Sequence, residues 1–282
     1  MSQVWMVTGS SRGLGRQIAT AAAAAGHSVV VTARNPDRVA DLVEAHGDRV
    51  LPVQLDVTDP AATQRAVERA VEHFGALDVV VNNAGQADFG AVEDTPVESF
   101  ISQVAINFWG VVHVTRAALP VMRKQGSGHI IQISSLGARM GTPGLAAYQG
   151  AKAAVNTFSL SLAKEVGPLG IKVTVVEPGN LRTDILSSSS MKMLPISAPY
   201  QQVVGAYADG LQSVNGSQSG DPERAAAAIV RVAQMPEPPE RLVLGSDALA
   251  YAGNVARELA ESDARWHEIS TSIDFPVGNP AR

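Results

Sequence analysis

Short runs of apolar, β-branched residues recur along the chain, and longer segments with helical spacing separate them. The runs predict strands at residues 4–8, 28–33, 50–56, 77–82, 129–134, 171–177 and 241–244. Several of them are apolar almost throughout, with no alternation of polar residues. This pattern is typical of strands that are buried on both faces of a parallel sheet.

Helical spacing fills the intervals between these runs, at residues 14–25, 36–46, 60–74, 96–124, 147–166 and 222–234. Proline stands at or near the start of several of these segments, and Gly26, Gly75 and Gly167 directly follow three of them. This is the expected asymmetry of helix ends. Strands that alternate with helices predict right-handed crossovers, so we expect an α/β fold with a single doubly wound, Rossmann-type parallel sheet of about seven strands and helices on both faces.

One segment departs from this rhythm before the last strand. Residues 178–220 form a long connection with a serine run at 187–190 and a glycine- and serine-rich stretch at 216–220. Connections of this length inside a compact domain are commonly functional covers. We therefore expect a variable substrate cover at residues 186–220.

A second departure follows the last strand. Ser246 can cap a helix in which Leu249, Ala252, Ala256 and Leu259 share one face. We therefore expect a Rossmann-type catalytic domain at residues 1–245 and a C-terminal helical extension at residues 246–282 that packs on the same domain.

Composition excludes several classes of protein. Of the 282 residues, 45% are hydrophobic and 17% are charged, a balance that supports a core and excludes a disordered chain. The 22 Lys and Arg against 27 Asp and Glu give a net charge of −5, without a basic stripe, so we expect no nucleic-acid partner. The lack of cysteine excludes disulfides and thiolate catalysis, and the six histidines show no metal-ligand spacing, so we expect no metal.

The N-terminal residues lack the basic region, long apolar stretch and cleavage site of a signal peptide. Uninterrupted apolar stretches stay far below the roughly 18 residues that a membrane span needs. We therefore expect a cytoplasmic protein with no membrane partner.

A glycine-rich turn, Thr8-Gly9-Ser10-Ser11-Arg12-Gly13-Leu14-Gly15, lies between the first strand and the first helix. Small residues there allow backbone amides and a helix N-terminus to approach a pyrophosphate. The spacing differs from G-x-G-x-x-G, because Ile18 stands where a third glycine is usual. Taken alone, the turn is also compatible with simple strand-to-helix geometry.

The end of the second strand bears on the choice of nucleotide. It carries Arg34 and lacks the acidic residue that binds the ribose 2′-hydroxyl of NAD. Arg34 and Arg12 could both reach a 2′-phosphate, although each alone is compatible with an ordinary surface arginine. The two together favour NADP(H) over NAD(H).

Tyr148 and Lys152 are four residues apart, and therefore on one helix face. A free tyrosine has a pKa of about 10, and a neighbouring cation lowers the pKa of the phenol towards the working range. The pair alone is a weak signal. Ser135, however, closes the fifth strand, and ligands of parallel sheets bind outside the carboxyl ends of the strands, where the glycine turn also lies.

With these motifs the chain resembles the short-chain dehydrogenase/reductase family. The resemblance is carried by Thr8-Gly9-x-x-x-Gly13-x-Gly15, Asn82-Asn83-Ala84-Gly85, Ser135 with Tyr148-x-x-x-Lys152, and Pro178-Gly179-x-x-x-Thr183, in the order typical of the family. It implies an oxidoreductase that transfers a hydride between NADP(H) and a small-molecule carbonyl or secondary alcohol.

The resemblance also implies roles for four catalytic residues. Tyr148 would be the general acid in reduction and the base in oxidation, and Lys152 would hold the nicotinamide ribose and lower the pKa of Tyr148. Ser135 would donate a hydrogen bond to the substrate oxygen. Asn107 would hold a water in a proton relay, unless it merely satisfies an irregularity of its helix.

The same resemblance implies the cofactor contacts. Asp56 and Val57 would meet the adenine, the segment 83–85 the adenosine ribose, and Leu181 and Thr183 the carboxamide of the nicotinamide. The expected cofactor-binding residues are Gly9, Ser11, Arg12, Gly13, Leu14, Gly15, Arg34, Asp56, Val57, Asn83, Ala84, Gly85, Tyr148, Lys152, Pro178, Gly179, Leu181 and Thr183.

Three functions are compatible with these residues. The first is an NADPH-dependent carbonyl reductase for a small or medium, largely apolar ketone or aldehyde, and the second is an NAD-dependent alcohol or steroid-type dehydrogenase that works oxidatively. The third, a catalytically silent nucleotide-sensing module, is disfavoured by the intact signature. Met191, Met193, Leu194, Tyr200 and Tyr207 could line an apolar substrate wall, or pack the cover onto its own domain.

The long C-terminal extension also bears on assembly. Short members of the family often form tetramers through the edge near the last strand, and the extension puts that contact in doubt. We therefore expect a homodimer through the helices at 96–124 and 147–166, with a tetramer as the alternative.

Overall fold

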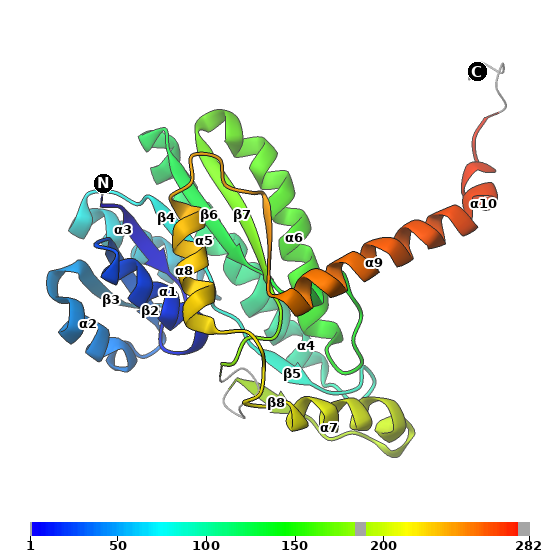
Figure 1. Cartoon of the computed structure of the whole chain (residues 1–282). Coiled ribbons are helices and arrows are strands. Elements are labelled where there is room, and N and C mark those ends of the chain that lie inside the picture. Colours follow the sequence, from blue (N-terminus) through cyan, green and yellow to red (C-terminus); the bar gives the residue numbers. More distant parts are fainter. Residues whose placement is uncertain (1, 184–189, 276–282) are drawn as a thin grey trace.

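All seven main strands lie in one parallel sheet, in the order β3-β2-β1-β4-β6-β7-β9 (Figure 1). This computed structural model describes residues 2–183 and 190–275. The strands are β1 (Val4–Val7), β2 (Ser28–Ala33), β3 (Val50–Gln54), β4 (Val79–Asn82), β6 (Gly128–Ile133), β7 (Ile171–Pro178) and β9 (Arg241–Leu244). The doubly wound α/β fold expected from the sequence is confirmed, and each strand begins and ends within two residues of its expected bounds.

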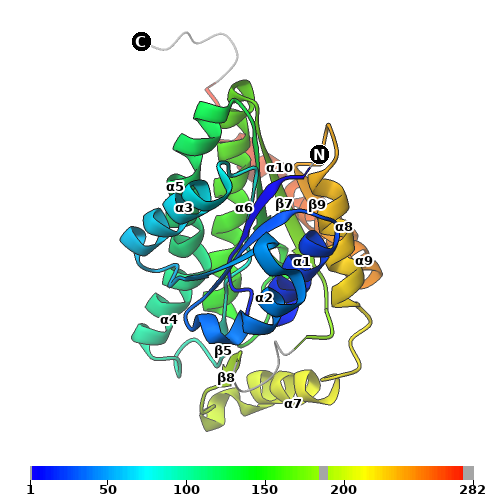
Figure 2. The same cartoon turned by 90° about the vertical axis from the view of Figure 1, so that its left-hand side faces the viewer.

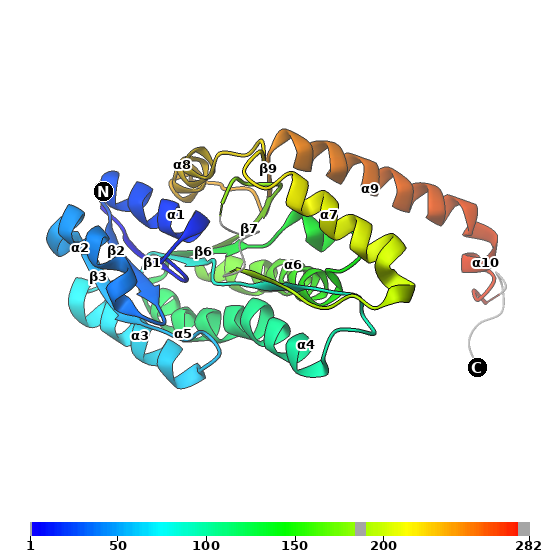
Figure 3. The ribbon, with the colours of Figure 1, turned by 90° about the horizontal axis from the view of Figure 1, so that it is seen from below.

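Helices cover both faces of this sheet, as Figure 3 shows. The α-helices of the described residues are α1 (Gly13–Ala24), α2 (Ala40–His46), α3 (Pro60–Phe74), α4 (Val97–Val104), α5 (Gly110–Gln125), α6 (Ala146–Val166), α7 (Ala206–Ser213), α8 (Pro222–Ala233), α9 (Ser246–Arg265) and α10 (His267–Thr271). Local signals explain α3: the side chain of Asp59 accepts from Ala61 N and Ala62 N, and Gly75 ends the helix with φ +82°. The left-handed backbone at Gly75 is one that side chains rarely adopt.

The strands separate two hydrophobic cores. In β1, Trp5 and Val7 join α1 and α8 in one core, whereas Met6 joins α3 and α5 in the other. Successive side chains of a strand point to opposite faces, so a strand that is apolar throughout is buried on both sides. This is the physical basis of the apolar runs in the sequence.

The single helix expected at 96–124 is in fact two α-helices, joined by a π-helical segment, η3 (Ala105–Trp109). By length and composition, the stretch Val97–Gln125 is apolar enough to cross a membrane. In the structure one side of this stretch packs against α3, α6 and the sheet, while Val97, Ile101 and Trp109 remain exposed. The extra residue of a π turn is a common feature of functional sites, and here it carries Asn107.

Two short strands were missed by sequence analysis. β5 (Ala87–Phe89) and β8 (Met191–Met193) form a separate parallel pair, and Figure 2 shows them with α7 at one end of the domain. Phe89 is fully buried, in a cluster with Met191, Val204 and Ala208. Of the expected cover at 186–220, residues 190–220 are described and residues 186–189 lie outside the described part of the chain.

The C-terminal extension contains the helix α9, and the first turns of this helix pack on the domain. Ala248 is 0% exposed and Ala252 is buried, against Leu136 and Val243. Leu249 and Leu259 are each 61% exposed. Leu249 faces away from the domain within the first turn, whereas Leu259 lies where α9 has left the domain and extends away from it with α10 (Figure 1). The extension therefore packs on the domain only through its beginning; residues 276–282 of the expected extension lie outside the described residues.

A pair of alanine substitutions checks this arrangement. Ile229→Ala removes a fully buried side chain of α8 and should lower the free energy of unfolding by about 2–5 kcal/mol. Leu249→Ala should change it by about 0.5 kcal/mol or less, because that side chain faces solvent. Urea denaturation of both variants measures the difference. A loss of similar size in Leu249→Ala would show that this face of α9 is packed.

Candidate active site

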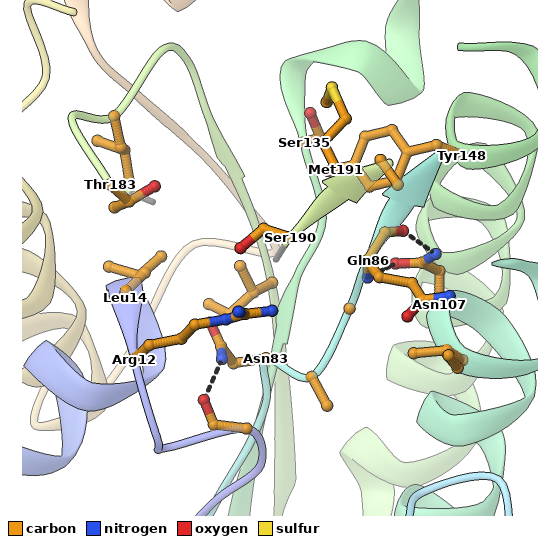
Figure 4. A pocket seen from close by; sticks show the side chains of 18 of the residues that line it. Arg12, Leu14, Asn83, Gln86, Asn107, Ser135, Tyr148, Thr183, Ser190 and Met191 are labelled. Carbon is orange, nitrogen blue, oxygen red and sulfur yellow. Dashed lines mark hydrogen bonds between the residues drawn. The ribbon is translucent and has the colours of Figure 1, made fainter. Parts of the chain in front are cut away.

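A cavity of about 380 Å³ opens at the carboxyl ends of the parallel strands. Its walls come from the turn between β1 and α1, from residues after β2, β3, β4, β6 and β7, from the start of α6 and from the cover. The strand order reverses between β1 and β4, and ligands of open α/β sheets bind at such a reversal. Figure 4 shows the cavity from close by.

The structure brings nearly all of the expected site residues to this cavity. The lining includes Gly9, Ser11, Arg12, Gly13, Leu14, Arg34, Asp56, Val57, Asn83, Ala84, Gly85, Asn107, Ser135, Tyr148, Lys152, Pro178, Gly179, Leu181 and Thr183. Gly15 is the exception among the expected residues. A Cβ there would lie 2.5 Å from Gly9 O and would also clash with the side chain of Asn83, so close packing explains this glycine rather than ligand access.

The glycine turn is tied to the end of β4 by a compact set of hydrogen bonds. The Thr8 hydroxyl accepts from Asn83 N at 2.9 Å and from Ala84 N at 3.0 Å. In return, the Asn83 side chain donates to Thr8 O at 2.9 Å. These bonds fix the two segments to each other at the edge of the cavity.

The chemistry of this turn fits an anionic group. Gly13 begins α1 with φ +56°, and the first turn of α1 carries no acidic residue and no side-chain cap. The amides at a helix N-terminus and the positive end of its dipole therefore remain available to a phosphate. The turn thus suits the pyrophosphate of a dinucleotide.

The far end of the cavity holds the residues expected at the adenosine. Asp56 accepts from Thr58 N at 2.9 Å and from the Thr58 hydroxyl at 2.7 Å. Partial burial raises the pKa of Asp56, but these hydrogen bonds and the nearby charge of Arg34 outweigh burial and bring the pKa below its usual value. Arg34 is exposed at the rim, and Arg12 extends across the cavity wall (Figure 4).

Ser135, Tyr148 and Met191 gather at the opposite end (Figure 4). Ser135 lies two residues after the end of β6, and Tyr148 and Lys152 lie four residues apart in the first half of α6. Lys152 Nζ donates to Ile133 O at 2.7 Å and lies 5.8 Å from the centre of the Tyr148 ring. The ammonium is therefore fixed to the end of β6 and lies over the face of the phenol ring.

Burial dominates the electrostatics of this group. It raises the pKa of Tyr148, against the smaller lowering effect of a hydrogen bond with Ser135. Burial also lowers the pKa of Lys152 to about 8. The net shift of the Tyr148 pKa is therefore upward, because desolvation of the phenol outweighs the hydrogen bond with Ser135. The expected lowering of this pKa by Lys152 stays a prediction.

Asn107 connects the π-helical segment to the floor of the cavity. Its side chain donates to Gln86 O at 2.7 Å and to Gln103 O at 2.9 Å, and accepts from Gln86 N at 3.3 Å. The bond to Gln103 O satisfies a carbonyl inside an irregular helix. This is the alternative role of Asn107 that the sequence left open. The bonds to Gln86 also hold the segment after Gly85 in place.

The cover contributes lining residues that sequence analysis largely missed: Ser190, Leu211, Val214 and Gln218. Of the expected apolar wall, only Met191 lines the cavity. Leu194 packs near Gly90, Tyr200 bonds Glu93 and Tyr207 stacks on Phe89. These three pack the cover onto its own domain, as the alternative interpretation proposed, and Met193 is partly exposed.

Further residues that line the cavity were not singled out in the sequence, and most of them are adjacent in sequence to the motif residues. They are Ala33, Leu55, Gln86, Ala87, Ile106, Ile133, Ser134, Leu145 and Asn180. Most directly precede or follow a residue that we singled out, so the register of each strand end would have identified them. Within residues 2–183 and 190–275, no group of three or more His, Asp or Glu side chains is placed to hold a metal ion.

The sheet and its cavity are those of a dinucleotide-binding fold, and comparison with known proteins gives the class of oxidoreductase. Residues 3–193 match the model of the short chain dehydrogenase family, and the chain belongs to this family. It is 51% identical over 271 residues to the oxidoreductase BOA17 of Botryotinia fuckeliana, covering 96% of this chain and 98% of that protein.

Solved structures give the same result. A short-chain dehydrogenase from Streptomyces avermitilis superposes with a TM-score of 0.91 at 37% identity, covering 98% of this chain and 100% of the other. The closed form of a serine dehydrogenase complexed with NADP+ superposes with a TM-score of 0.74 at 28% identity, covering 86% and 94% of the two chains.

The lowered pKa of Lys152 gives a test of its burial. Below pH 8 Lys152 is charged in both the folded and the unfolded state, and burial of the charged ammonium destabilises the folded state fully. Between pH 8 and pH 10 the folded state loses this proton before the unfolded state does, so the destabilisation is relieved as the pH rises. The free energy of unfolding of the wild type relative to Lys152→Met should therefore increase by about 2 kcal/mol across this range. Urea denaturation at a series of pH values measures it, and a constant difference would contradict the burial of a charged amine.

Proposed function

We propose that this oxidoreductase is an NADPH-dependent carbonyl reductase that acts on a small or medium, largely apolar ketone or aldehyde. The observation that carries the proposal is the convergence of Ser135, Tyr148 and Lys152 in the same cavity as the glycine turn. The nicotinamide cofactor, when bound, supplies the hydride. The protein contributes the proton, the placement of charge and the exclusion of water.

Tyr148 is the proton donor in this proposal. Burial raises the pKa of Tyr148, so the phenol carries its proton near neutral pH and can act as the general acid. As the proton leaves, negative charge develops on the phenol oxygen, and the ammonium of Lys152 stabilises it. Ser135 donates a hydrogen bond to the carbonyl oxygen of the substrate and orients it towards Tyr148.

The cofactor preference rests on charge. Arg12 and Arg34 both line the cavity, and β2 ends without the acidic residue that would bind a ribose 2′-hydroxyl. A guanidinium forks onto two phosphate oxygens, so these arginines favour the 2′-phosphate of NADP(H). The NADP+ complex of the serine dehydrogenase supports the same preference.

The substrate class rests on the cover. Its described residues that line the cavity are Ser190, Met191, Leu211, Val214 and Gln218, and none of these carries a charge. Leu145 and Ala87 add further apolar surface. A wall of this kind favours a substrate whose carbonyl is its main polar group.

The proposal includes a homodimer. Val97 and Ile101, one turn apart on α4, and Trp109 on η3 are exposed large apolar side chains. A second copy of the chain against this surface would bury them.

Replacement of Tyr148 by phenylalanine tests the chemistry. The ring stays and only the hydroxyl is lost, so turnover of NADPH with a panel of ketones should fall by about 100-fold or more. The Kd for NADPH, from fluorescence titration, should stay within about twofold of the wild type.

Tyr200→Phe is the matched control for this variant. It removes a hydroxyl that bonds Glu93 outside the cavity, and it should retain turnover. Undiminished turnover in Tyr148→Phe would assign the proton to another group, and a wild type without turnover would favour a nucleotide-sensing module.

Replacement of Arg34 by aspartate tests the cofactor. The new carboxylate repels a 2′-phosphate and accepts from a ribose hydroxyl, so the ratio of the Kd for NADPH to the Kd for NADH should rise at least about tenfold. Arg49→Asp makes the same change of charge at an exposed residue outside the cavity and should leave the ratio unchanged. If both variants shift the ratio equally, long-range charge rather than contact decides the preference.

A further inference from the structure

A fully buried carboxylate lies next to the cavity without lining it. Glu177 is the residue before Pro178 at the end of β7, and its side chain is 0% exposed. A buried charge of this kind destabilises a protein strongly unless it is fully paired. Glu177 is paired on both oxygens, and the partners come from two further segments of the site.

The first partner is Arg139, which meets the carboxylate with both arms of its guanidinium. Arg139 Nε donates to Glu177 Oε1 at 2.9 Å, and Arg139 Nη2 donates to Glu177 Oε2. The contact raises the pKa of Arg139, so the guanidinium stays charged. A bidentate pair fixes the orientation of its partners as well as their distance.

The second partner is Asn156, whose Nδ2 donates to Glu177 Oε1 at 2.7 Å. Asn156 is buried in α6, four residues after Lys152 and eight after Tyr148. Residues spaced by four lie along one face of a helix. The carboxylate therefore holds the helix face that carries the proposed proton donor and its ammonium.

Arg139 in turn ends η4 (Leu136–Arg139), the short helix that begins directly after Ser135. Within this segment the Ser135 hydroxyl accepts from Gly137 N at 3.0 Å, and Ser135 O accepts from Ala138 N at 3.0 Å. The position of η4 therefore sets the direction of the Ser135 hydroxyl. Because that hydroxyl accepts from Gly137, its own proton is left to donate.

We propose that Glu177, Arg139 and Asn156 are positioning residues that fix the Ser135 hydroxyl relative to Tyr148 and Lys152. The described lining of the cavity includes none of the three, so they act through the segments that they join. An apolar cluster could join these segments without burying a charge. The ionic network, unlike apolar contacts, also fixes the orientation of the segments that it joins. The inference rests on the proposed function for its kinetic consequence, while the bracing of η4 is independent of it.

Glu177→Gln tests this role, because it keeps the shape of the side chain and removes the charge. We expect kcat for ketone reduction to fall at least about tenfold, with KM and the Kd for NADPH within about threefold of the wild type. In the oxidative direction, the rise of kcat/KM with pH, which reports the free enzyme, should move to higher pH, because without substrate the hydrogen bond with Ser135 lowers the pKa of Tyr148. A purely structural role would leave that pH profile in place.

Thr174→Val provides the matched control. Thr174 lies in the same strand, is fully buried, and bonds His129 at 2.9 Å and Pro239 O at 2.8 Å, away from the cavity. It should lower the melting temperature and leave kcat and the pH profile unchanged. The proposal would be overturned if both Glu177→Gln and Thr174→Val kept the kcat of the wild type.

Hydrogen exchange separates this proposal from the proposed function. In Glu177→Gln the amides of residues 136–139 should exchange at least about tenfold faster than in Thr174→Val, whether or not a ketone is turned over. Equal exchange in the two variants would overturn the bracing, whereas a wild type without turnover would overturn only the proposed function.

If Glu177→Gln does not fold, Arg139→Lys takes its place, because that side chain is 23% exposed and keeps its charge. It should show the same pattern of kcat loss and faster exchange, and wild-type behaviour would reject the proposal.

Discussion

Parallel pairing imposes the constraint on which this molecule depends, because it brings the carboxyl ends of all strands in the sheet to one edge. The turn after β1, Ser135 after β6 and Pro178 at the end of β7 meet there although they are far apart in the chain. Short hydrogen bonds then join these ends across the edge: Thr8 with the segment after β4, Lys152 with Ile133, and Glu177 with Arg139. The cavity is thus a product of the topology, and the side chains adjust its details.

Much of this arrangement could be predicted from the sequence because it follows from local rules. Strands buried on both faces must be apolar throughout, and a helix such as α3 has its start and end fixed by Asp59, Pro60 and Gly75. The motif residues could be assigned to the strand ends for the same reason. All of these signals operate over a few residues, so they are present in the sequence before any long-range contact forms.

The features that the sequence did not predict depend on long-range contacts. β5 and β8 have three residues each and exist only because they pair with each other. The apolar spacing of α9 predicted a packed face, yet only Ala248 and Ala252 of this helix are buried, and the helix leaves the domain after its first turns. The direction of the pKa shift at Tyr148 was also missed, because it depends on burial of the phenol, which neighbours in sequence do not determine.

The small sheet of β5 and β8 holds the cover segment independently of the elements that carry the reacting groups. The reacting groups come from β6 and α6, whereas the segment from residue 190 to residue 218 reaches the cavity through its pairing with β5. The pairing uses backbone hydrogen bonds, which demand little of the side chains that face the ligand. Divergent relatives can therefore remodel this segment to admit new molecules while the groups that carry out the reaction stay in place.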